Sequence, residues 1–446
     1  MDELWTNLGP EVINISYTGS RSIIHRVIQI DFSSISAFLT GFSTYPQPLR
    51  LRLRIFTIFF LYKHTHPAVR KGELSTIMKL VFDKADLVKS VAIAMKAVSG
   101  KTTMPILQCI LIDASSSQIK FTSNDMELGI ETLVTGMILE RGIVALDAKI
   151  FSEIVRKLPD NQVTIETDEN LVTTITCEKA KFNIPGQSGE DFSYLPILET
   201  SDCVSISQFT LKELIRQTIF SIAANENNKL MTGELFEIKD NTLRVVSLDG
   251  HRIAIRRIEL KDSYPDRKVV VPGKTLNEIS KILSGEMDDQ IDIYFSENHI
   301  MFKFDDTTVV SRLIDGEYFR IDQMLSSDYE TKVTINKKEF LSCIDRATLL
   351  VKEGDKKPII IDIQDGAMEL QINSAMGSMK EEIDINKEGK DIMIGFNPKF
   401  LIDALRVIDD EEISIYLVNP KAPCFIRNEE ESYIYLILPV NFNSVR

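Results

Sequence analysis

The sequence predicts an α+β protein built from three domains in tandem. Two observations predict this class. A helical pattern with basic residues in matching places recurs three times, and short alternating strands with polar turns fill the stretches between the helices. The recurrent helices are predicted at Asp147 to Leu158, Gly273 to Leu283 and Pro398 to Ile408. Their spacing is close to the size of an ordinary domain, so each period is interpreted as one domain.

Each recurrent helix carries two basic residues on one face. Lys149, Lys274 and Lys399 stand at equal intervals, and Arg156, Lys281 and Arg406 each follow seven positions later. Seven residues are close to two turns of about 3.6 residues each, so both charges fall on one line, opposite an apolar stripe. For one helix, a solvated face is the ordinary explanation. Threefold recurrence favours a surface for a polyanion.

A second, less regular helix begins each domain. Its apolar positions include Leu87, Leu214 and Leu341. Its basic positions are Lys89 and Lys96 in the first copy, Lys212 and Arg216 in the second, and Lys337, Lys338 and Arg346 in the third. Strand hairpins are predicted at Ile110–Asp113 with Gln118–Thr122, Leu235–Ile238 with Leu243–Val246, and Ile359–Ile363 with Met368–Ile372. Each domain therefore contains two helix-plus-strands units. Such repeats form an open array or close on themselves, and closure would place the basic faces on the same side.

The predicted domains span 78–198, 204–321 and 328–446. Residues 1–77 are interpreted as an atypical N-terminal extension or an over-extended reading frame, because Met78 offers a second start just before the first repeat. The apolar run Ile55 to Tyr62 is too short to cross a bilayer and too far along the chain for a secretory signal. Five cysteines without paired spacing suit a reducing cytoplasm, with no disulfide or zinc scaffold.

The overall charge is acidic, with 51 Lys and Arg against 65 Asp and Glu. The net charge of the whole chain argues against a nucleic-acid partner, but it does not reveal a local stripe of basic residues. Catalytic motifs are weak. Acid clusters such as Asp409 to Glu412 fall in expected turns, residues 99–102 and 272–275 lack the first glycine of a phosphate loop, and residues 186–190 lack the hydrolase pattern. His251 sits in a turn with no Ser or Cys partner nearby. We therefore expect no enzyme, metal or cofactor.

Four short motifs carry a family resemblance: Met104-Pro105-Ile106-Leu107, residues 247–252 (Ser-Leu-Asp-Gly-His-Arg), Ile394-Gly395-Phe396-Asn397 and Leu438-Pro439-Val440. From about Met78 to Val440 the chain resembles the bacterial sliding clamp, the beta subunit of DNA polymerase III. The resemblance implies the DNA clamp fold, in which two three-domain chains close head to tail as a homodimeric ring around duplex DNA, with helices inside and sheets outside. It implies a cytoplasmic, nucleoid-associated processivity factor for replication and repair. An open, nonenzymatic duplex-binding scaffold is the alternative.

The resemblance also implies site residues. The basic residues expected to face DNA without reading its sequence are Lys89, Lys96, Lys101, Lys149, Arg156, Arg216, Lys274, Lys281, Arg346, Lys399 and Arg406. A cleft for short peptide motifs of the replicative polymerase, the clamp loader and repair proteins is expected at Met231, Leu248, Gly250, His251, Arg252, Ile253, Met324, Asn397, Phe400, Leu436, Ile437, Leu438, Pro439 and Val440. Phe182 and Ile184 are expected to meet Leu349 and Leu350 of the other chain, with a place in a domain core as the alternative for either pair.

The chain departs from the family pattern beside the expected cleft. Phe319 follows Gly316-Glu317-Tyr318 where the family usually has proline, and Gln323 replaces a common arginine. The carboxyl end lacks the usual arginine and runs a few residues longer. These changes are expected to alter the binding of partners and not the fold.

Overall fold

The computed structural model describes residues 77–100, 102–198, 203–224, 228–352 and 357–442. The chain divides into two units, Met1–Glu73 and Leu74–Arg446, and every described residue belongs to the second. The predicted N-terminal extension, Lys101 and the last four residues lie outside the described residues. Domains 1, 2 and 3 below denote the three predicted repeats.

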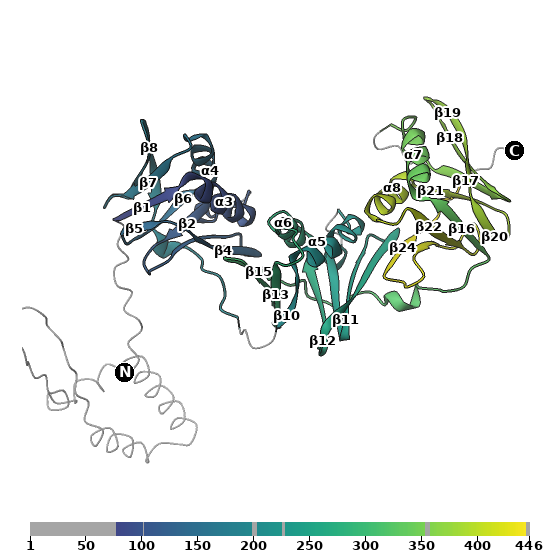
Figure 1. The fold of residues 1–446 in the computed structure, drawn as a ribbon, viewed down its shortest axis with the longest axis horizontal. Coiled ribbons are helices and arrows are strands. Elements are labelled where there is room, and N and C mark those ends of the chain that lie inside the picture. The colour runs from purple at the N-terminus through teal and green to yellow at the C-terminus, as the bar shows by residue number, and fades with distance from the viewer. Residues whose placement is uncertain (1–76, 101, 199–202, 225–227, 353–356, 443–446) are drawn as a thin grey trace, which may run out of the picture. The chain divides into compact units, whose positions relative to one another are not determined.

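Domain 1 has two helices and a set of antiparallel strands (Figure 1). Its elements are β1 (Met78–Asp83), α3 (Lys84–Ala94), η4 (Met95–Ala97), η5 (Pro105–Gln108), β2 (Cys109–Asp113), β3 (Ile119–Asn124), β4 (Leu128–Val134), β5 (Met137–Glu140), β6 (Ile143–Asp147), α4 (Ala148–Lys157), β7 (Gln162–Thr167), β8 (Val172–Cys177), β9 (Ala180–Gln187) and η6 (Gly189–Asp191).

Domain 2 repeats this order with fewer, longer strands. Its elements are β10 (Cys203–Ser207), α5 (Gln208–Arg216), η7 (Ile219–Ser221), η8 (Lys229–Thr232), β11 (Gly233–Leu248), β12 (Arg252–Pro272), α6 (Gly273–Ser280), β13 (Gln290–Phe295), β14 (His299–Phe304) and β15 (Thr307–Arg312). The short η9 (Ile321–Gln323) follows on the way to domain 3.

Domain 3 closes the series with the same alternation. It comprises β16 (Thr331–Asn336), α7 (Lys337–Thr348), β17 (Ile359–Gln364), β18 (Ala367–Ser374), β19 (Gly377–Asp384), β20 (Asn386–Gly389), β21 (Ile392–Phe396), α8 (Pro398–Val407), β22 (Glu412–Leu417), β23 (Cys424–Arg427) and β24 (Tyr433–Ile437). The repeated α+β organisation predicted from the sequence is confirmed.

Polar side chains begin most of these helices. Asp83, Asp147 and Ser207 accept hydrogen bonds from backbone N–H groups in the first turns of α3, α4 and α5, and Asn336 and Asn397 do the same for α7 and α8. Such caps satisfy donors that have no partner within the helix. The first helix of each domain packs against the second: α3 with α4, α5 with α6, and α7 with α8 (Figure 1).

A lysine from the first helix stabilises the end of the second helix in each domain. Lys212 and Lys337 donate to the carbonyls of Leu283 and Ile408, at 3.2 and 2.5 Å. Lys84 instead pairs with Asp160, just after α4, at 2.7 Å. A positive charge at a helix carboxyl end complements the helix dipole and its unpaired carbonyls.

Strand pairing joins the domains directly. A 13-stranded sheet continues from domain 1 into domain 2 where β4 pairs with β15, from Leu128 opposite Ser311 to Thr132 opposite Thr307. A 7-stranded sheet continues from domain 2 into domain 3 where β12 pairs with β24. The remaining 4-stranded sheet, in the order β19-β18-β17-β21, lies within domain 3. The domains are therefore held by backbone hydrogen bonds as well as by their connecting segments.

The apolar core follows the repeat. One buried cluster lies within domain 1 around Phe121 and Phe151, another mainly in domain 2 around Phe236 and Phe302, and a third mainly in domain 3 around Phe340. A fourth cluster lies at the junction of domains 2 and 3 and includes Leu235, Leu248 and Leu436. This junction cluster supports the cleft described below.

Two predicted elements differ in extent. The helix expected to reach Leu283 ends at Ser280, where the chain passes into a turn. The hairpin expected between Ile238 and Leu243 is one strand, β11, whose register shifts on both sides of Asp240. Asp240 has a φ of 54°, so the predicted polar turn is a local bend within a continuous strand. Within the described residues, no helix is long and apolar enough to span a membrane.

Candidate nucleic-acid interface and partner-binding cleft

The predicted DNA-facing residues fall into two groups. Lys89, Lys149, Arg156 and Lys399 are exposed and have no ionic partner within the described part of the chain. Lys149 and Arg156 lie on α4, whose buried side contains Phe151 and Val155, so their charges point away from the core of domain 1. These cations are free to bind an external anion.

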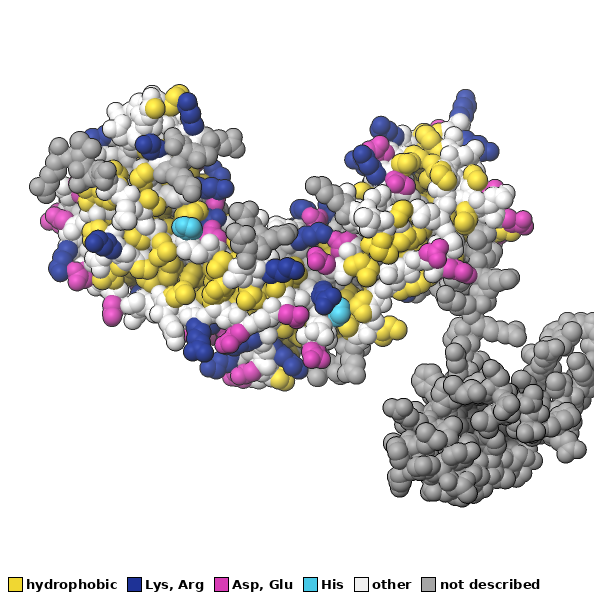
Figure 2. All heavy atoms as spheres, turned by 180° about the vertical axis from the view of Figure 1, so that it is seen from behind, with side chains coloured by type: hydrophobic (Ala, Val, Ile, Leu, Met, Phe, Trp, Pro, Cys, Tyr) yellow, Lys and Arg dark blue, Asp and Glu magenta, His cyan; other side chains and the backbone are white. Residues whose placement is uncertain are grey.

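The other predicted cations have carboxylate partners. Lys281 pairs with Glu278 at 2.7 Å, Arg406 with Asp345 at 3.3 Å, Arg346 with Glu381, and Lys274 with Asp125. Lys96 lies just beyond α3, in η4, with its amino group 3.8 Å from Glu278. Figure 2 shows the same mixing of charge on the face it draws, where basic and acidic side chains lie interspersed. Partnered cations contribute less field toward DNA than free ones.

Arg216 lies at the junction of domains 2 and 3. Its guanidinium pairs with Glu213 at 2.5 Å and Asp409 at 2.9 Å and donates to the carbonyl of Val407 at 3.2 Å. The hydrogen bond to Glu213, which outweighs partial desolvation, raises the pKa of Arg216 above its usual range. Arg216 therefore connects domain 2 to domain 3, although about a third of its side chain remains exposed.

An apolar cleft lies where domains 2 and 3 meet. It has a volume of about 420 Å³ and is lined by Met231, Leu248, Gly250, His251, Arg252, Ile253, Phe319, Met324, Pro423, Leu436 and Leu438. Nine of the predicted cleft residues are among these. Phe319 and Pro423 were not predicted: the departure from the family pattern marked Phe319, whereas no sequence signal marked Pro423.

The other predicted cleft residues lie around this lining. Phe400 contacts His251, with ring centroids 6.0 Å apart, and Asn397 caps α8. Ile437 is buried in the core of domain 3. Beyond it the chain is held by hydrogen bonds from the Leu438 N–H to the His251 carbonyl and from the Val440 N–H to the Gly395 carbonyl, both 2.8 Å. These bonds fix the strand end beside the cleft.

A tight turn presents the residues of the cleft wall. Asp249 accepts backbone hydrogen bonds from His251 and Arg252, at 3.0 and 3.2 Å. Gly250, between them, has a φ of 87°, which side-chain-bearing residues rarely adopt. The turn leads directly into β12, so the pairing of β12 with β24 places the walls of the cleft on neighbouring strands.

Arg252 locks this wall in place. Its side chain, 8% exposed, pairs with Asp249 at 3.0 Å and with Asp403 at 2.7 Å. It also donates to the Phe220 carbonyl at 2.6 Å and stacks on the Phe400 ring at 4.5 Å. Because Asp403 belongs to domain 3, this arginine fixes the two sides of the cleft relative to each other.

Two strand edges stand out at opposite ends of the repeat. β9 pairs with β8 along its length but with β6 only at Gly186 and Gln187, so the far edge of residues 180–185 has no strand partner among the described residues. β19 likewise pairs only with β18 in the described chain. Phe182 on β9 is 40% exposed and Leu349, just after α7, is 79% exposed. Ile184 is buried in the core of domain 1 and Leu350 is half-buried.

The repeated domains, their strand-paired junctions and the apolar interdomain cleft define a three-domain DNA clamp fold. Three family models match the chain in order: the DNA polymerase III beta subunit N-terminal domain at residues 78–196, the central domain at 205–319 and the C-terminal domain at 322–441. The chain therefore belongs to the DNA polymerase III beta subunit family.

Curated relatives and solved structures agree with this assignment. The beta sliding clamp of Staphylococcus epidermidis is 34% identical over 357 residues, covering 78% of this chain and 94% of the relative, and that of Staphylococcus aureus is 35% identical with the same coverage. A putative DNA polymerase III beta subunit from Eubacterium rectale is 70% identical, with a TM-score of 0.80. The sliding clamp from Bacillus subtilis is 35% identical, with a TM-score of 0.79. Each structure match covers 82% of this chain and 100% of the other.

Proposed function

We propose that two copies of this chain close head to tail into a ring around duplex DNA and tether the replicative polymerase, the clamp loader and repair proteins through the cleft. The chain acts as a sliding clamp, the role for which its relatives are named. It binds and does not catalyse.

The main observation that supports a ring is the repeated strand pairing between consecutive domains. β4, the first part of β12, and β19 are equivalent strands, each paired with the preceding strand of its hairpin. β9, β15 and β24 are likewise equivalent last strands of their domains. Within the chain β4 pairs with β15, and β12 pairs with β24. The same junction formed once more would join β19 of one protomer to β9 of its partner, and doing so twice closes a dimer.

Charge and apolar side chains at the two edges support this junction. Lys181 lies on β9 and Lys179 directly precedes it, whereas β19 carries three acidic residues, Glu381, Glu382 and Asp384, against one lysine, Lys380. Exposed Phe182 and Leu349 supply apolar groups of the kind that interfaces bury. We propose that the three clamp domains span residues 78–198, 204–321 and 328–446.

Inside such a ring, cations must hold the duplex without gripping one sequence. The free cations Lys89, Lys149, Arg156 and Lys399 suit phosphate contacts of this kind. The six partnered cations named above remain candidates, because DNA can compete for a surface ion pair that contributes little stability. Lys101 is retained from the family resemblance.

Retention on circular DNA tests the ring. The full chain would be loaded onto nicked circular DNA with a clamp loader, washed at high salt, and followed before and after the circle is cut. Charge contacts to six to ten phosphates lose roughly 10³ to 10⁵ in affinity between about 50 and 200 mM salt. Retention at high salt that ends on cutting supports a closed ring, whereas release by salt alone supports the open scaffold and contradicts the proposal.

A further inference from the structure

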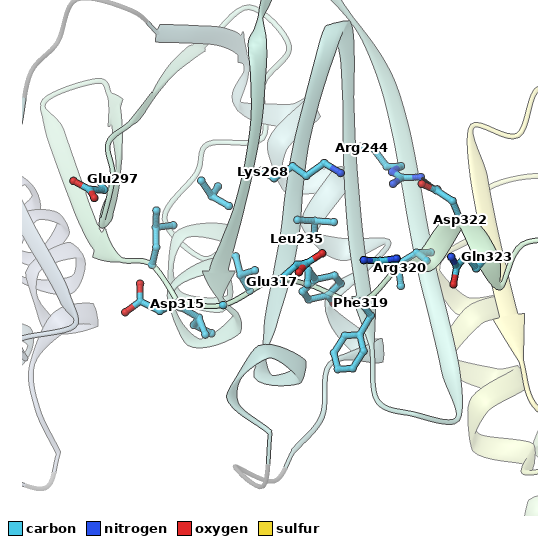
Figure 3. A pocket seen from close by; sticks show the side chains of 17 residues that line it. Leu235, Arg244, Lys268, Glu297, Asp315, Glu317, Phe319, Arg320, Asp322 and Gln323 are labelled. Atoms are coloured by element: carbon cyan, nitrogen blue, oxygen red, sulfur yellow. Dashed lines mark hydrogen bonds and ion pairs between the residues drawn. The ribbon is translucent and has the colours of Figure 1, made fainter.

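A second depression adjoins the cleft. It has a volume of about 570 Å³ and is lined by parts of β11, β12 and residues 313–323. Phe319 lines both hollows. We call this depression the charged basin and define it by Arg244, Lys268, Glu317, Phe319 and Arg320, which Figure 3 draws as sticks.

The basin and the cleft rest on one apolar cluster. Leu235 and Ile321 below the basin, and Leu248 and Leu436 below the cleft, all belong to the buried cluster at the junction of domains 2 and 3. The Phe319 ring packs edge to face on Tyr318, with centroids 5.6 Å apart. Phe319 is therefore a fixed partition between an apolar hollow and a charged one.

The cations of the basin differ in how far they are neutralised. Glu237, which is buried, pairs with Arg244 at 2.5 Å and with Lys268 at 2.6 Å. Arg244 also pairs with Asp322 at 2.6 Å, and its hydrogen bond lowers the pKa of that carboxyl group. Arg244 is thus shared by two carboxylates. The Lys268 side chain is 69% exposed, with one carboxylate partner.

Arg320 is exposed and has no ion-pair partner among the described residues. In Figure 3 its side chain extends back across the basin toward Glu317, while Glu297 and Asp315 lie at the opposite end from Arg244 and Asp322. Figure 3 shows Lys268 reaching toward Arg244, on the side of the basin away from Phe319, whereas Arg320 lies nearer Phe319. Beside Phe319, Arg320 thus presents donors that are available to an incoming anion.

We propose that the charged basin receives an acidic side chain of a partner protein whose apolar anchor occupies the cleft. The inference rests on the proposed function of the cleft and adds a charge requirement to it. Arg320 pairs with the carboxylate, Lys268 adds positive charge from the Arg244 side of the basin, and Phe319 separates the carboxylate from the anchor. Glu317, on the same segment as Arg320, opposes this binding and limits its strength.

Peptide binding tests the inference. Fluorescein-labelled decapeptides share a Leu-Phe anchor and carry either Glu or Gln at one position, which is moved through the three positions on each side of the anchor. Their dissociation constants for the full chain are measured by fluorescence anisotropy. At one position the Glu peptide is expected to bind about two- to five-fold tighter than its Gln counterpart, the range of an exposed ion pair, and the difference should shrink as salt is added.

Variants separate the basin from the cleft. Arg320→Gln should remove the Glu preference without changing the binding of the Gln peptide, and Glu317→Gln should increase it. Arg141→Gln, which changes an exposed arginine of domain 1, should alter neither. Leu438→Asp, in the cleft wall, should weaken both peptides.

Two results would overturn the inference in different ways. Equal affinities for the Glu and Gln peptides at every position, with the binding of both peptides lost in Leu438→Asp, would contradict the role of the basin. The same result would still support the cleft as the peptide-binding site. Binding of none of the peptides by the unmodified chain would contradict the peptide cleft itself, and the basin with it.

Discussion

Glu234 is a buried acid in the middle of domain 2. Its side chain is fully buried on β11, and neither carboxyl oxygen has a hydrogen-bond partner within the described residues. Burial raises the pKa of Glu234 well above its usual value, although the nearby Thr218 hydroxyl lowers it in part. That hydroxyl donates its own hydrogen bond to the Leu214 carbonyl at 2.7 Å. Burial therefore favours the protonated, neutral form of this carboxyl group in the folded chain.

Replacing Glu234 by glutamine should change how stability depends on pH. The folded chain keeps the proton of Glu234 above pH 4.5, where the unfolded chain releases it, so stability falls as pH rises toward the folded-state pKa. This fall is about 1.4 kcal/mol per pH unit. Glu234→Gln removes it, so urea unfolding should show a gain at pH 7.5 and little change at pH 4. An equal effect at both pH values would contradict a neutral buried acid.

Arg252 joins the two sides of the cleft through buried contacts. Arg252→Ala leaves Asp403 without its cation and removes the bond to the Phe220 carbonyl, so we expect a loss of about 3 kcal/mol in the free energy of unfolding. Binding of the anchored Gln peptide should weaken as well. Urea titration and anisotropy measure the two effects. Arg141→Ala is the control, and a double-mutant cycle with Asp403→Asn should show coupling between Arg252 and Asp403.

At the scale of single elements, α4 is the clearest test of the DNA-facing surface. Lys149→Gln and Arg156→Gln each remove a free cation, so each should weaken duplex binding and lower the salt slope by about one. Lys281→Gln should have a smaller effect, because Glu278 already neutralises Lys281. Lys157→Gln, on the same helix but outside the repeated positions, is the matched control. Binding would be followed by anisotropy over a range of salt concentrations, and equal effects of all four substitutions would contradict the assignment.

The elements show what the sequence could predict. Apolar spacing and the recurrent basic residues predicted the helices, because helical periodicity is a local signal. The pairing of β4 with β15 could not be predicted, since alternation marks the faces of a strand and not the neighbour along its edge. The ion pairs of Lys274 with Asp125 and of Arg216 with Asp409 also escaped prediction, because these carboxylates come from distant segments. The family pattern drew attention to Phe319, but only the structure places it between two hollows.

At the scale of the whole molecule, the proposed subunit junction predicts a charge exchange. Lys181→Glu places like charges at the junction of β9 and β19 and should shift the dimer toward monomer, and Glu382→Lys should do the same. The two substitutions together should restore the dimer, because the attraction is re-formed with opposite signs. Sedimentation velocity at several protein concentrations measures the distribution. Failure of the double variant to recover would contradict the proposed pairing of these edges.

The sheets that continue across the domain boundaries also determine whether the domains stay together after proteolytic cleavage between them. The segment between Gln323 and Thr331 connects domains 2 and 3, but five paired residues of β12 and β24 and the ion pair of Arg252 with Asp403 join them independently of that segment. A single cleavage in this segment breaks one peptide bond and leaves the β12–β24 pairing and the Arg252–Asp403 ion pair intact. The nicked protein should remain one particle under native conditions and separate into two fragments only in denaturant. The peptide linker thus contributes less to holding domains 2 and 3 together than the hydrogen-bonded strand pairing between them.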